Sequence, residues 1–322
     1  MIIAVVGCTV DKDGNSCNLG AGKDTVADEL VRSHGFVKMG FADPFKRFVQ
    51  DVYDFSDDQI WGSSKYRNGA DRRYFRGFGD FGLVCSACRE ACISGELEKA
   101  KPATGIEVPC DACGDVYDKN ALYTMRIPQF LTPRYALQQI GSEWGRNCYD
   151  PTWVEYLLKT VRRLEQGGAY YDSKLGLRYT AEVEGVMEAK KNVVVSDLRF
   201  RNEIGRLRQE GAKIILLVHP VDSLPSGVDL SHGSENELKG LPASNYDLVL
   251  VNNGTIEDLQ KSIKVGYDLL LSGIFHKKYP VPYLVADARN VTGISALFET
   301  TFHTVRVSSD LAFQRELIIR EE

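Results

Sequence analysis

The chain has 322 residues, of which 43% are hydrophobic and 26% are charged, so it can bury a sizeable core in one large domain or in one domain with additions. Its net charge of −5 provides no overall basic field, which disfavours a protein that coats nucleic acid non-specifically. No run approaches the roughly 20 apolar residues of a membrane span, and the N-terminus is typical of a core strand rather than a signal peptide. We therefore expect a cytoplasmic protein with no membrane partner.

The first part of the chain alternates strands and helices. Residues 1–7 (MIIAVVG) are an apolar, β-branched run ended by glycine, which predicts a strand buried on both faces. Residues 23–34 carry a helical apolar stripe, and residues 36–41 predict a second strand. Residues 44–52 predict a helix with Asp43 as its N-cap and proline at its first position.

The segment "GAGKDT" (residues 20–25) lies between the first strand and the first helix. It offers successive backbone N–H groups, the positive end of a helix dipole and a lysine ammonium, three features that bind a polyphosphate. The usual phosphate loop opens with a glycine at the position that is Cys17 here, five residues before Gly22. We therefore interpret residues 8–19 as an insertion spliced between the strand and the phosphate cradle.

The remainder of the chain continues the alternation. Residues 56–84 show no clear period and are expected to be irregular. Helices are expected from Thr132 onward and at 153–164, 201–210 and 256–271, a hairpin at 170–186, and strands at 192–196, 213–219 and 246–251. This order predicts an α/β domain with a mostly parallel sheet and helices on both faces. Residues 273–322 lie beyond the last helix and form a C-terminal addition of unknown role.

Four of the eight cysteines form two C-x-x-C pairs, Cys85 with Cys88 and Cys110 with Cys113. Four thiolates in this spacing predict a closed, tetrahedral structural zinc site in an insertion at residues 85–125. A redox dithiol and an iron–sulfur cluster are the alternatives, and Cys92 could compete as a ligand. The other cysteines, interpreted as packing residues or free thiols, are Cys8, Cys17 and Cys148.

A polar segment follows the strand at residues 192–196. Asp197 can hold Mg²⁺, directly or through water, or fix an acceptor, with a helix N-cap as the alternative role. Arg199 and Arg201 can neutralise the charge that develops on a transferring phosphoryl group. The following Arg206 and Arg208 fit a solvated basic helix face better.

Residues 132–146 (TPRYALQQIGSEWGR) place Arg134 near the N-terminus of a helix, where an arginine suits a phosphate, and Gln138 where an amide can bind a base edge. An amphipathic surface helix is the alternative, and this segment alone favours it. His232 lies in "SHGSENEL", which is either a polar surface turn or a segment that closes over a nucleotide.

Six ordered segments of the chain resemble the phage-type deoxynucleoside monophosphate kinases, a branch of the P-loop kinases. They are "GAGKDTVADEL" (20–30), "GFADPFKR" (40–47), "TPRYALQQIGSEWGR" (132–146), "VVVSDLRFRNE" (193–203), "SHGSENEL" (231–238) and "YDLVLVNNGTIEDLQ" (246–260). The resemblance implies a three-layer P-loop NTPase fold with a mostly parallel sheet, to which this chain adds a small zinc-knuckle insertion. It also implies transfer of the γ-phosphoryl of ATP, with Mg²⁺, to a deoxynucleoside monophosphate. The expected domains are a kinase core at 1–84 and 126–272, the insertion at 85–125 and the addition at 273–322.

The resemblance also implies roles for individual residues. ATP would be bound by Gly20, Ala21, Gly22, Lys23, Asp24 and Thr25, with Lys23 on the β- and γ-phosphates and Thr25 on phosphate oxygens. Lys46, Arg134 and Arg146 would face the acceptor phosphate, and Phe45, Gln138 and Trp144 would line the base pocket. The expected catalytic residues are Lys23, Asp197, Arg199 and Arg201. Asp24 occupies the usual Ser/Thr position, so a direct hydroxyl ligand to Mg²⁺ is not expected there.

Three other interpretations stay open. Related P-loop kinases phosphorylate hydroxymethylated pyrimidines within phage DNA, and here the cysteine knuckles and the C-terminal addition would grip the DNA. A non-catalytic nucleotide-binding interaction protein is a second alternative, and a more distant resemblance to phosphomevalonate kinases, which share the GKD sequence, is a third. The expected partners are a deoxynucleoside monophosphate, or DNA in the first alternative, and a homodimer is left open. If a phage encodes the chain, its location is the host cytoplasm.

Overall fold

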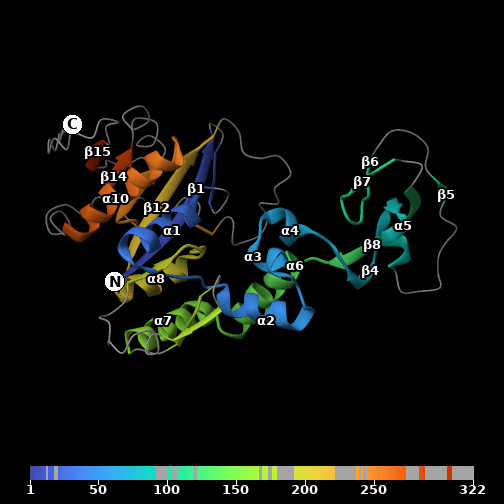
Figure 1. Cartoon of the computed structure of the whole chain (residues 1–322), viewed down its shortest axis with the longest axis horizontal. Helices are drawn as coiled ribbons and strands as arrows, with labels where there is room; N and C mark the ends of the chain where they lie inside the picture. Colours follow the sequence, from blue (N-terminus) through green and yellow to red (C-terminus); the bar gives the residue numbers. More distant parts are fainter. Residues whose placement is uncertain are drawn as a thin grey trace. The chain divides into compact units, whose positions relative to one another are not determined.

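The chain forms two compact units, which we describe separately. The computed structural model describes residues 1–11, 14–17, 21–91, 101–102, 108–118, 122–166, 169–172, 176–179, 192–221, 237–238, 241, 245–272, 283–286 and 303–306. The first unit comprises residues 1–41 and 153–322, and the second comprises residues 42–152 (Figure 1). Within these described ranges, no helix combines the length and the apolar character that crossing a membrane requires.

A parallel sheet forms the centre of the first unit. Its strand order is β15 (His303–Arg306), β14 (Tyr283–Ala286), β13 (Leu248–Val251), β12 (Lys213–Pro220), β1 (Ile2–Asp11), β11 (Val193–Val195) and β3 (Val37–Met39). Every neighbouring pair along this order is parallel. Two strands from the C-terminal addition, β14 and β15, therefore extend the same sheet as the phosphate-loop strand.

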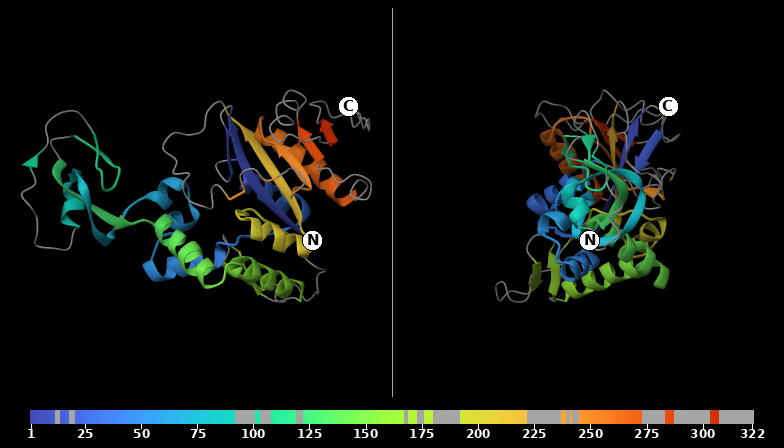
Figure 2. Two further views of the ribbon diagram at one scale, coloured as in Figure 1. Left: turned by 180° about the vertical axis from the view of Figure 1, so that it is seen from behind. Right: turned by 90° about the vertical axis from the view of Figure 1, so that its right-hand side faces the viewer.

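Helices cover both faces of this sheet, as the alternating side chains of β1 require. Ile3 and Val5 belong to a buried cluster with α1 (Lys23–His34) and α10 (Ile256–Ser272). The intervening Ala4 and Val6 belong to a second buried cluster with α7 (Thr152–Glu165) and α8 (Arg201–Gln209). The predicted α/β class, with a mostly parallel sheet and helices on both faces, is confirmed (Figure 2).

The insertion in the phosphate loop is a β-hairpin. Strand β1 continues past Gly7 and pairs antiparallel with β2 (Gly14–Cys17), so that Cys8 lies opposite Cys17 in the register. Cys8 packs in the buried core, as one of its two interpretations predicts, but it is disulfide-bonded, so the free-thiol interpretation is wrong: an apolar strand pattern indicates burial and does not report bonding. Cys148, by contrast, is a free and exposed thiol, as expected.

A second predicted hairpin also forms in the first unit. Strands β9 (Ala169–Asp172) and β10 (Gly176–Tyr179) pair antiparallel, as the alternation around residues 174–176 predicts.

The second unit contains short helices and a long two-stranded ribbon. The helices are α2 (Asp43–Tyr53), α3 (Asp57–Trp61), α4 (Ser64–Asn68), α5 (Ser86–Glu90), α6 (Pro133–Gln138) and the π-helix η2 (Gln139–Arg146). The ribbon pairs β4 (Asp71–Cys85) with β8 (Leu122–Leu131), and β5 (Lys101–Pro102) adds to β8 (Figures 1 and 2). Strands β6 (Val108–Pro109) and β7 (Val116–Tyr117) form a small hairpin near its end.

Two sequence predictions in this unit are wrong. Residues 56–84 are not irregular, because they form α3, α4 and β4. Helix α3 begins with a capping box between Ser56 and Gln59, and β4 is stabilised by pairing with a strand far along the chain. Asp43 is the first residue of α2, and its N-cap is Ala42. The helix expected from Thr132 onward is present as α6, and the Thr132 hydroxyl caps it by accepting a hydrogen bond from the Tyr135 N–H at 3.1 Å.

Candidate active site

The phosphate cradle is assembled where β1 meets α1. A Cβ at Gly7 would lie 2.7 Å from Lys23 Cγ and 2.9 Å from Ala21 Cβ, so the lysine side chain crosses the strand at a position that only glycine can occupy. Gly22 has a left-handed conformation (φ 95°) and is the N-cap of α1, where no side-chain cap hydrogen bond is made. The hairpin therefore brings Gly7 next to Ala21–Lys23, and backbone N–H groups and a lysine converge as an anion site requires.

Asn252 holds this cradle in place and has no predicted role from the sequence. Its side-chain amide donates to the Ala21 carbonyl at 2.9 Å, and its backbone N–H donates to the Val218 carbonyl at 2.7 Å. It follows the buried strand β13, so its position is fixed by the sheet. The signal was its place at a strand end within "VNNG", a common place for ligand-binding or loop-anchoring side chains in parallel sheets.

Asp24, at the usual Ser/Thr position of the loop, is part of a charged cluster. Its carboxylate accepts from Lys38 Nζ at 2.7 Å and from the Ser196 hydroxyl at 3.2 Å, and Lys38 also bonds Asp28 at 3.1 Å. Burial raises the pKa of Asp24, but the charges and hydrogen bonds of Lys38, together with Lys23 and Ser196, hold that pKa below its ordinary value. Asp24 is therefore an anion whose charge is balanced by a neighbouring strand residue.

Asp197 lies at the carboxyl end of β11, as the sequence predicts. One of its carboxylate oxygens accepts the Phe41 N–H at 2.9 Å. Phe41 is the last residue of the first unit before the chain enters the second one. Asp197 therefore fixes the start of the "FADPFK" segment, in addition to any role toward a nucleotide.

The arginines after Asp197 are positioned by a buried carboxylate. Glu203, which is only 3% exposed, accepts the N–H groups of Arg199 at 2.9 Å and Phe200 at 3.0 Å. This arrangement fixes the loop that carries Arg199 and the first turn of α8. Arg201 is exposed, and its Nε donates to the Glu237 carbonyl at 2.9 Å.

Two further arginines of α8 are half-buried and make ion pairs, rather than forming the solvated basic face that the sequence favours. Arg206 pairs with Glu155 and, at 2.8 Å, with Glu210. Arg208 donates to the Asn245 carbonyl at 2.6 Å and pairs with Asp247 at 3.2 Å.

In the second unit, helix α2 packs against α6 and η2 and brings together residues expected to bind the acceptor. The ring of Phe45 lies against Gly141, where a Cβ would be 3.0 Å from the ring. The ammonium of Lys46 lies 4.5 Å from the centre of the Trp61 ring, a cation–π contact. Trp61 was not predicted, and its indole N–H donates to Gln50 Oε1 at 3.2 Å, which fixes the ring under Lys46.

The other expected acceptor residues lie on α6 and η2. Arg134 and Gln138 are half-buried on α6, and Trp144 is 58% exposed on η2. Arg146 is largely buried and pairs with Asp150 at 2.7 Å. Residues 139–146 adopt a π-helix, which sequence periodicity cannot predict and which is frequent at functional sites.

The four predicted metal ligands converge at the end of the β4–β8 ribbon. One ligand atom from each of Cys85, Cys88, Cys110 and Cys113 lies within 4.8 Å of all the others, and all four are free thiols. Backbone N–H groups of Cys85 and Cys88 donate to the sulfurs of Cys110 and Cys85 at 3.3 and 3.4 Å. Four converging sulfurs with N–H donors match a closed tetrahedral site that suits zinc.

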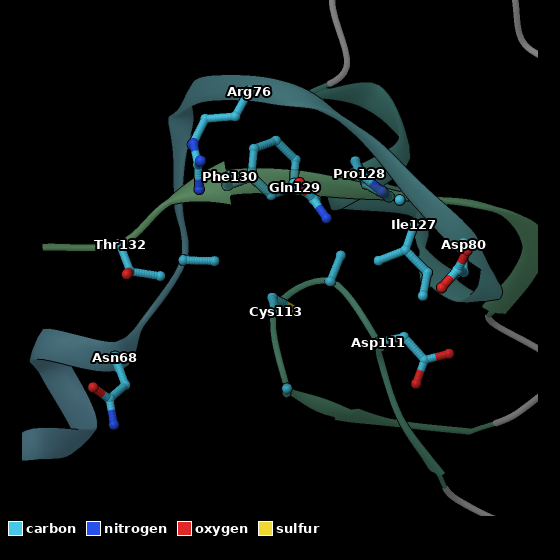
Figure 3. A pocket seen from close by; sticks show the side chains of 14 residues that line it. Asn68, Arg76, Asp80, Asp111, Cys113, Ile127, Pro128, Gln129, Phe130 and Thr132 are labelled. Atoms are coloured by element: carbon cyan, nitrogen blue, oxygen red, sulfur yellow. The ribbon is translucent and has the colours of Figure 1, made fainter. Parts of the chain in front are cut away.

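A separate concavity of about 630 Å³ lies between the ribbon and the cysteine loop. Figure 3 shows Arg76 and Gln129 on the ribbon side, facing Asp111 and Cys113 on the loop. Arg76 is engaged, because its guanidinium lies 3.6 Å from the centre of the Tyr135 ring. Asp111 accepts the Leu83 N–H at 2.6 Å and so ties the loop to β4.

Some predicted residues lie outside the described part of the chain. These are Gly20 of the phosphate loop, Cys92, His232 and the rest of residues 231–236.

Comparison with known proteins bears on this geometry. Residues 172–263 match the family model described as deoxynucleotide monophosphate kinase. A protein of Acanthamoeba polyphaga mimivirus, described as "Putative deoxynucleotide monophosphate kinase", is 26% identical over 244 residues, which cover 76% of this chain and 89% of the relative. The chain is thus similar to the deoxynucleotide monophosphate kinases. The resemblance expected from the six segments and the prediction of a nucleotide kinase are thereby confirmed.

Proposed function

We propose that this nucleotide kinase transfers the γ-phosphoryl group of ATP to a deoxynucleoside 5′-monophosphate, giving ADP and the deoxynucleoside diphosphate. The observation that carries the proposal is the cradle in which Lys23 lies across Gly7 at the N-terminus of α1. Phosphoryl transfer needs positioned cations and little covalent chemistry from the protein. The descriptions of the family model and of the viral relative support a monophosphate as the acceptor.

The residues of the first unit would act on the donor. The N–H groups of Ala21–Lys23 would bind phosphate oxygens, with the Lys23 ammonium on the β- and γ-phosphates and the Thr25 hydroxyl nearby. Arg199 and Arg201 would stabilise charge on the transferring group. The carboxylates of Asp24 and Asp197 offer the oxygen ligands that Mg²⁺ prefers. Bound Mg²⁺ would neutralise phosphate charge.

The residues of the second unit would bind the acceptor. Lys46, Arg134 and Arg146 supply three cations for a monophosphate, and Phe45, Gln138 and Trp144 supply aromatic and amide surfaces for a base. The packing of α2 against α6 and η2 gathers these groups in one unit. The four cysteines are proposed to hold a structural Zn²⁺, outside the reaction itself.

The test is ADP release from Mg-ATP with the common deoxynucleoside monophosphates, their hydroxymethylated forms, and single- and double-stranded DNA carrying the same bases. Turnover on free monophosphates is the expected result and would name the preferred base. Turnover on DNA alone would replace the proposal with a DNA-directed kinase. Tight ATP binding without turnover on any acceptor would indicate a non-catalytic nucleotide-binding protein.

A further inference from the structure

Three consecutive residues at the start of β4 connect the cysteine knuckle to the helices of the second unit. Side chains alternate between the two faces of a strand, so Arg72 projects opposite to its neighbours Asp71 and Arg73. Arg72 contacts the knuckle, while Asp71 and Arg73 contact the helices. The contacts to the knuckle and the contacts to the helices are therefore joined through three consecutive residues of backbone.

Arg72 reaches the sulfur atoms of the knuckle. Its Nε donates to Cys88 Sγ at 3.2 Å, and its Nη2 donates to Asp115 Oδ2 at 3.2 Å. The same Asp115 oxygen lies 3.4 Å from Cys113 Sγ, so one guanidinium spans both C-x-x-C pairs. Four thiolates around a divalent ion carry a net negative charge, which a neighbouring guanidinium neutralises while it orients the ligands.

Asp71 and Arg73 grip the ends of two helices. Asp71, 8% exposed, accepts two charge-assisted bonds from Arg73, at 3.0 and 2.8 Å, and one from Gln59 of α3 at 3.0 Å. Arg73 Nη2 also donates at 3.0 Å to the carbonyl of Asp54, the residue that ends α2 in a left-handed conformation. The C-terminal end of α2 and the first turn of α3 are thus held by the start of β4, the strand whose last residue is the knuckle cysteine Cys85.

These helices carry the side chains proposed to bind the acceptor. Phe45 and Lys46 are on α2, and Lys46 rests on Trp61 of α3. Gln50 of α2 bonds both Trp61 and, at 2.6 Å, Asp57 of α3. The orientation of Lys46 therefore depends on how α2 and α3 are held together.

We propose that the four-cysteine knuckle is a metal-dependent brace for α2 and α3, and that Arg72 is the positioning residue that joins the two. Metal binding orders the knuckle, Arg72 locks the start of β4 against it, and Asp71 and Arg73 hold the helices. The link to catalysis rests on the proposed function, whereas the mechanical link does not. The knuckle is thus part of acceptor binding without touching the acceptor.

The experiment compares the full-length protein with R72Q, the conservative R72K and the control R89Q. Arg89 is also a knuckle arginine, but its guanidinium lies over the Tyr123 ring at 4.4 Å. Three quantities are measured with and without removal of zinc by a chelator: zinc per chain, KM for the monophosphate and for ATP, and hydrogen exchange of residues 50–62. Exchange of residues 213–220 in β12 reports whether the first unit stays folded.

Removing zinc and replacing Arg72 with Gln should both accelerate exchange in residues 50–62. Both should raise the KM for the monophosphate by about 10- to 100-fold, the range for residues that support metal ligands, with the KM for ATP and β12 exchange unchanged. R72K should be intermediate and R89Q should resemble the wild type. Unchanged exchange at 50–62 after zinc removal or in R72Q, or an equal effect of R89Q, would overturn the brace. If the wild type phosphorylates no monophosphate, the proposed function fails, and the exchange data still decide on the brace.

Discussion

The phosphate cradle and the cysteine knuckle each bring together segments that are distant in the sequence, but different forces hold them. The cradle sits on β1, whose side chains are buried on both faces in the two largest apolar clusters of the described residues. The knuckle has a small cluster in which three members are cysteines, and it depends on thiols and ion pairs. A site built on an apolar sheet is rigid before its ligand arrives, whereas a thiol-based knuckle is expected to need its metal to become rigid.

The largest effect should come from removing the charge of the cradle. In K23M the ammonium that would stabilise the transition state is lost, and kcat should fall by about 100- to 1,000-fold. The cradle is formed by the sheet, so the melting temperature should stay close to that of the wild type. ADP-release assays and thermal unfolding measure the two quantities. Full activity in K23M would remove this loop from the mechanism.

A second prediction tests the rigidity of the cradle without changing its charge. In G7A the new methyl group would meet Lys23 Cγ at 2.7 Å and push the side chain away. A displacement of about 1 Å can cost about 100-fold in rate, and a loss of this order is expected in kcat. G205A is the matched control, because a Cβ at Gly205 in α8 would have no neighbour within 4 Å. A fully active G7A enzyme would show that the cradle adapts to the added methyl group and is not rigid before its ligand arrives.

The sequence predicts the elements that are encoded locally and misses those that depend on contacts between distant segments. The cradle, its strand and its helix are encoded locally by residues 1–7 and 20–34, and the sheet strands by their apolar runs. Strand β4 was missed because its stability comes from pairing with β8, which no local period reports. The convergence of the four cysteines was predicted from their spacing alone.

Supporting residues were harder to predict than the residues they support. Asn252, Trp61 and Glu203 are ordinary polar or aromatic positions in the sequence, and only the fold shows what each one holds. The bonded state of Cys8 is likewise not contained in the apolar pattern of its strand. Contacts across the fold decide these roles, and a linear pattern does not contain them.

The third prediction concerns the pH dependence of the stability that the ion pairs of the second unit provide. Hydrogen bonds from Arg73 lower the pKa of Asp71, burial raises it, and a hydrogen bond from Gln59 lowers it further. The net result is a folded-state pKa below the ordinary value of 3.8. A carboxyl with a depressed folded pKa contributes stability above its unfolded pKa and loses it as the pH falls through the folded pKa. D71N should therefore reduce the free energy of unfolding by about 1–3 kcal/mol at pH 7.

The difference between D71N and the wild type should persist down to about pH 4 and shrink below it, where the wild-type carboxyl becomes protonated. Urea unfolding of both proteins across this range measures the difference. D51N is a suitable control, since Asp51 is an exposed residue in an i,i+4 pair with Arg47 and should change stability by less than about 1 kcal/mol. A pH-independent difference would mean that the Asp71 charge does not hold α2 and α3.

The smallest effect should come from the charge that balances Asp24. In K38M the Asp24 carboxylate, 77% exposed, would lose its ion pair at 2.7 Å, so its charge beside the polyphosphate would be less well balanced. Lys38 lowers the pKa of Asp24 more than Lys23 or Ser196 does, so the affinity for Mg-ATP should drop when Lys38 is replaced. The drop should be less than about tenfold, because an exposed ion pair is worth about 1 kcal/mol or less. K213M, which breaks the Lys213–Asp247 pair at 3.3 Å, is the matched control and should bind Mg-ATP normally. Calorimetric titration with Mg-ATP at two salt concentrations measures the affinity of each protein. A loss of affinity in K38M that becomes smaller at high salt would support charge balance by Lys38. Equal affinity of K38M and the wild type would show that Asp24 does not need Lys38.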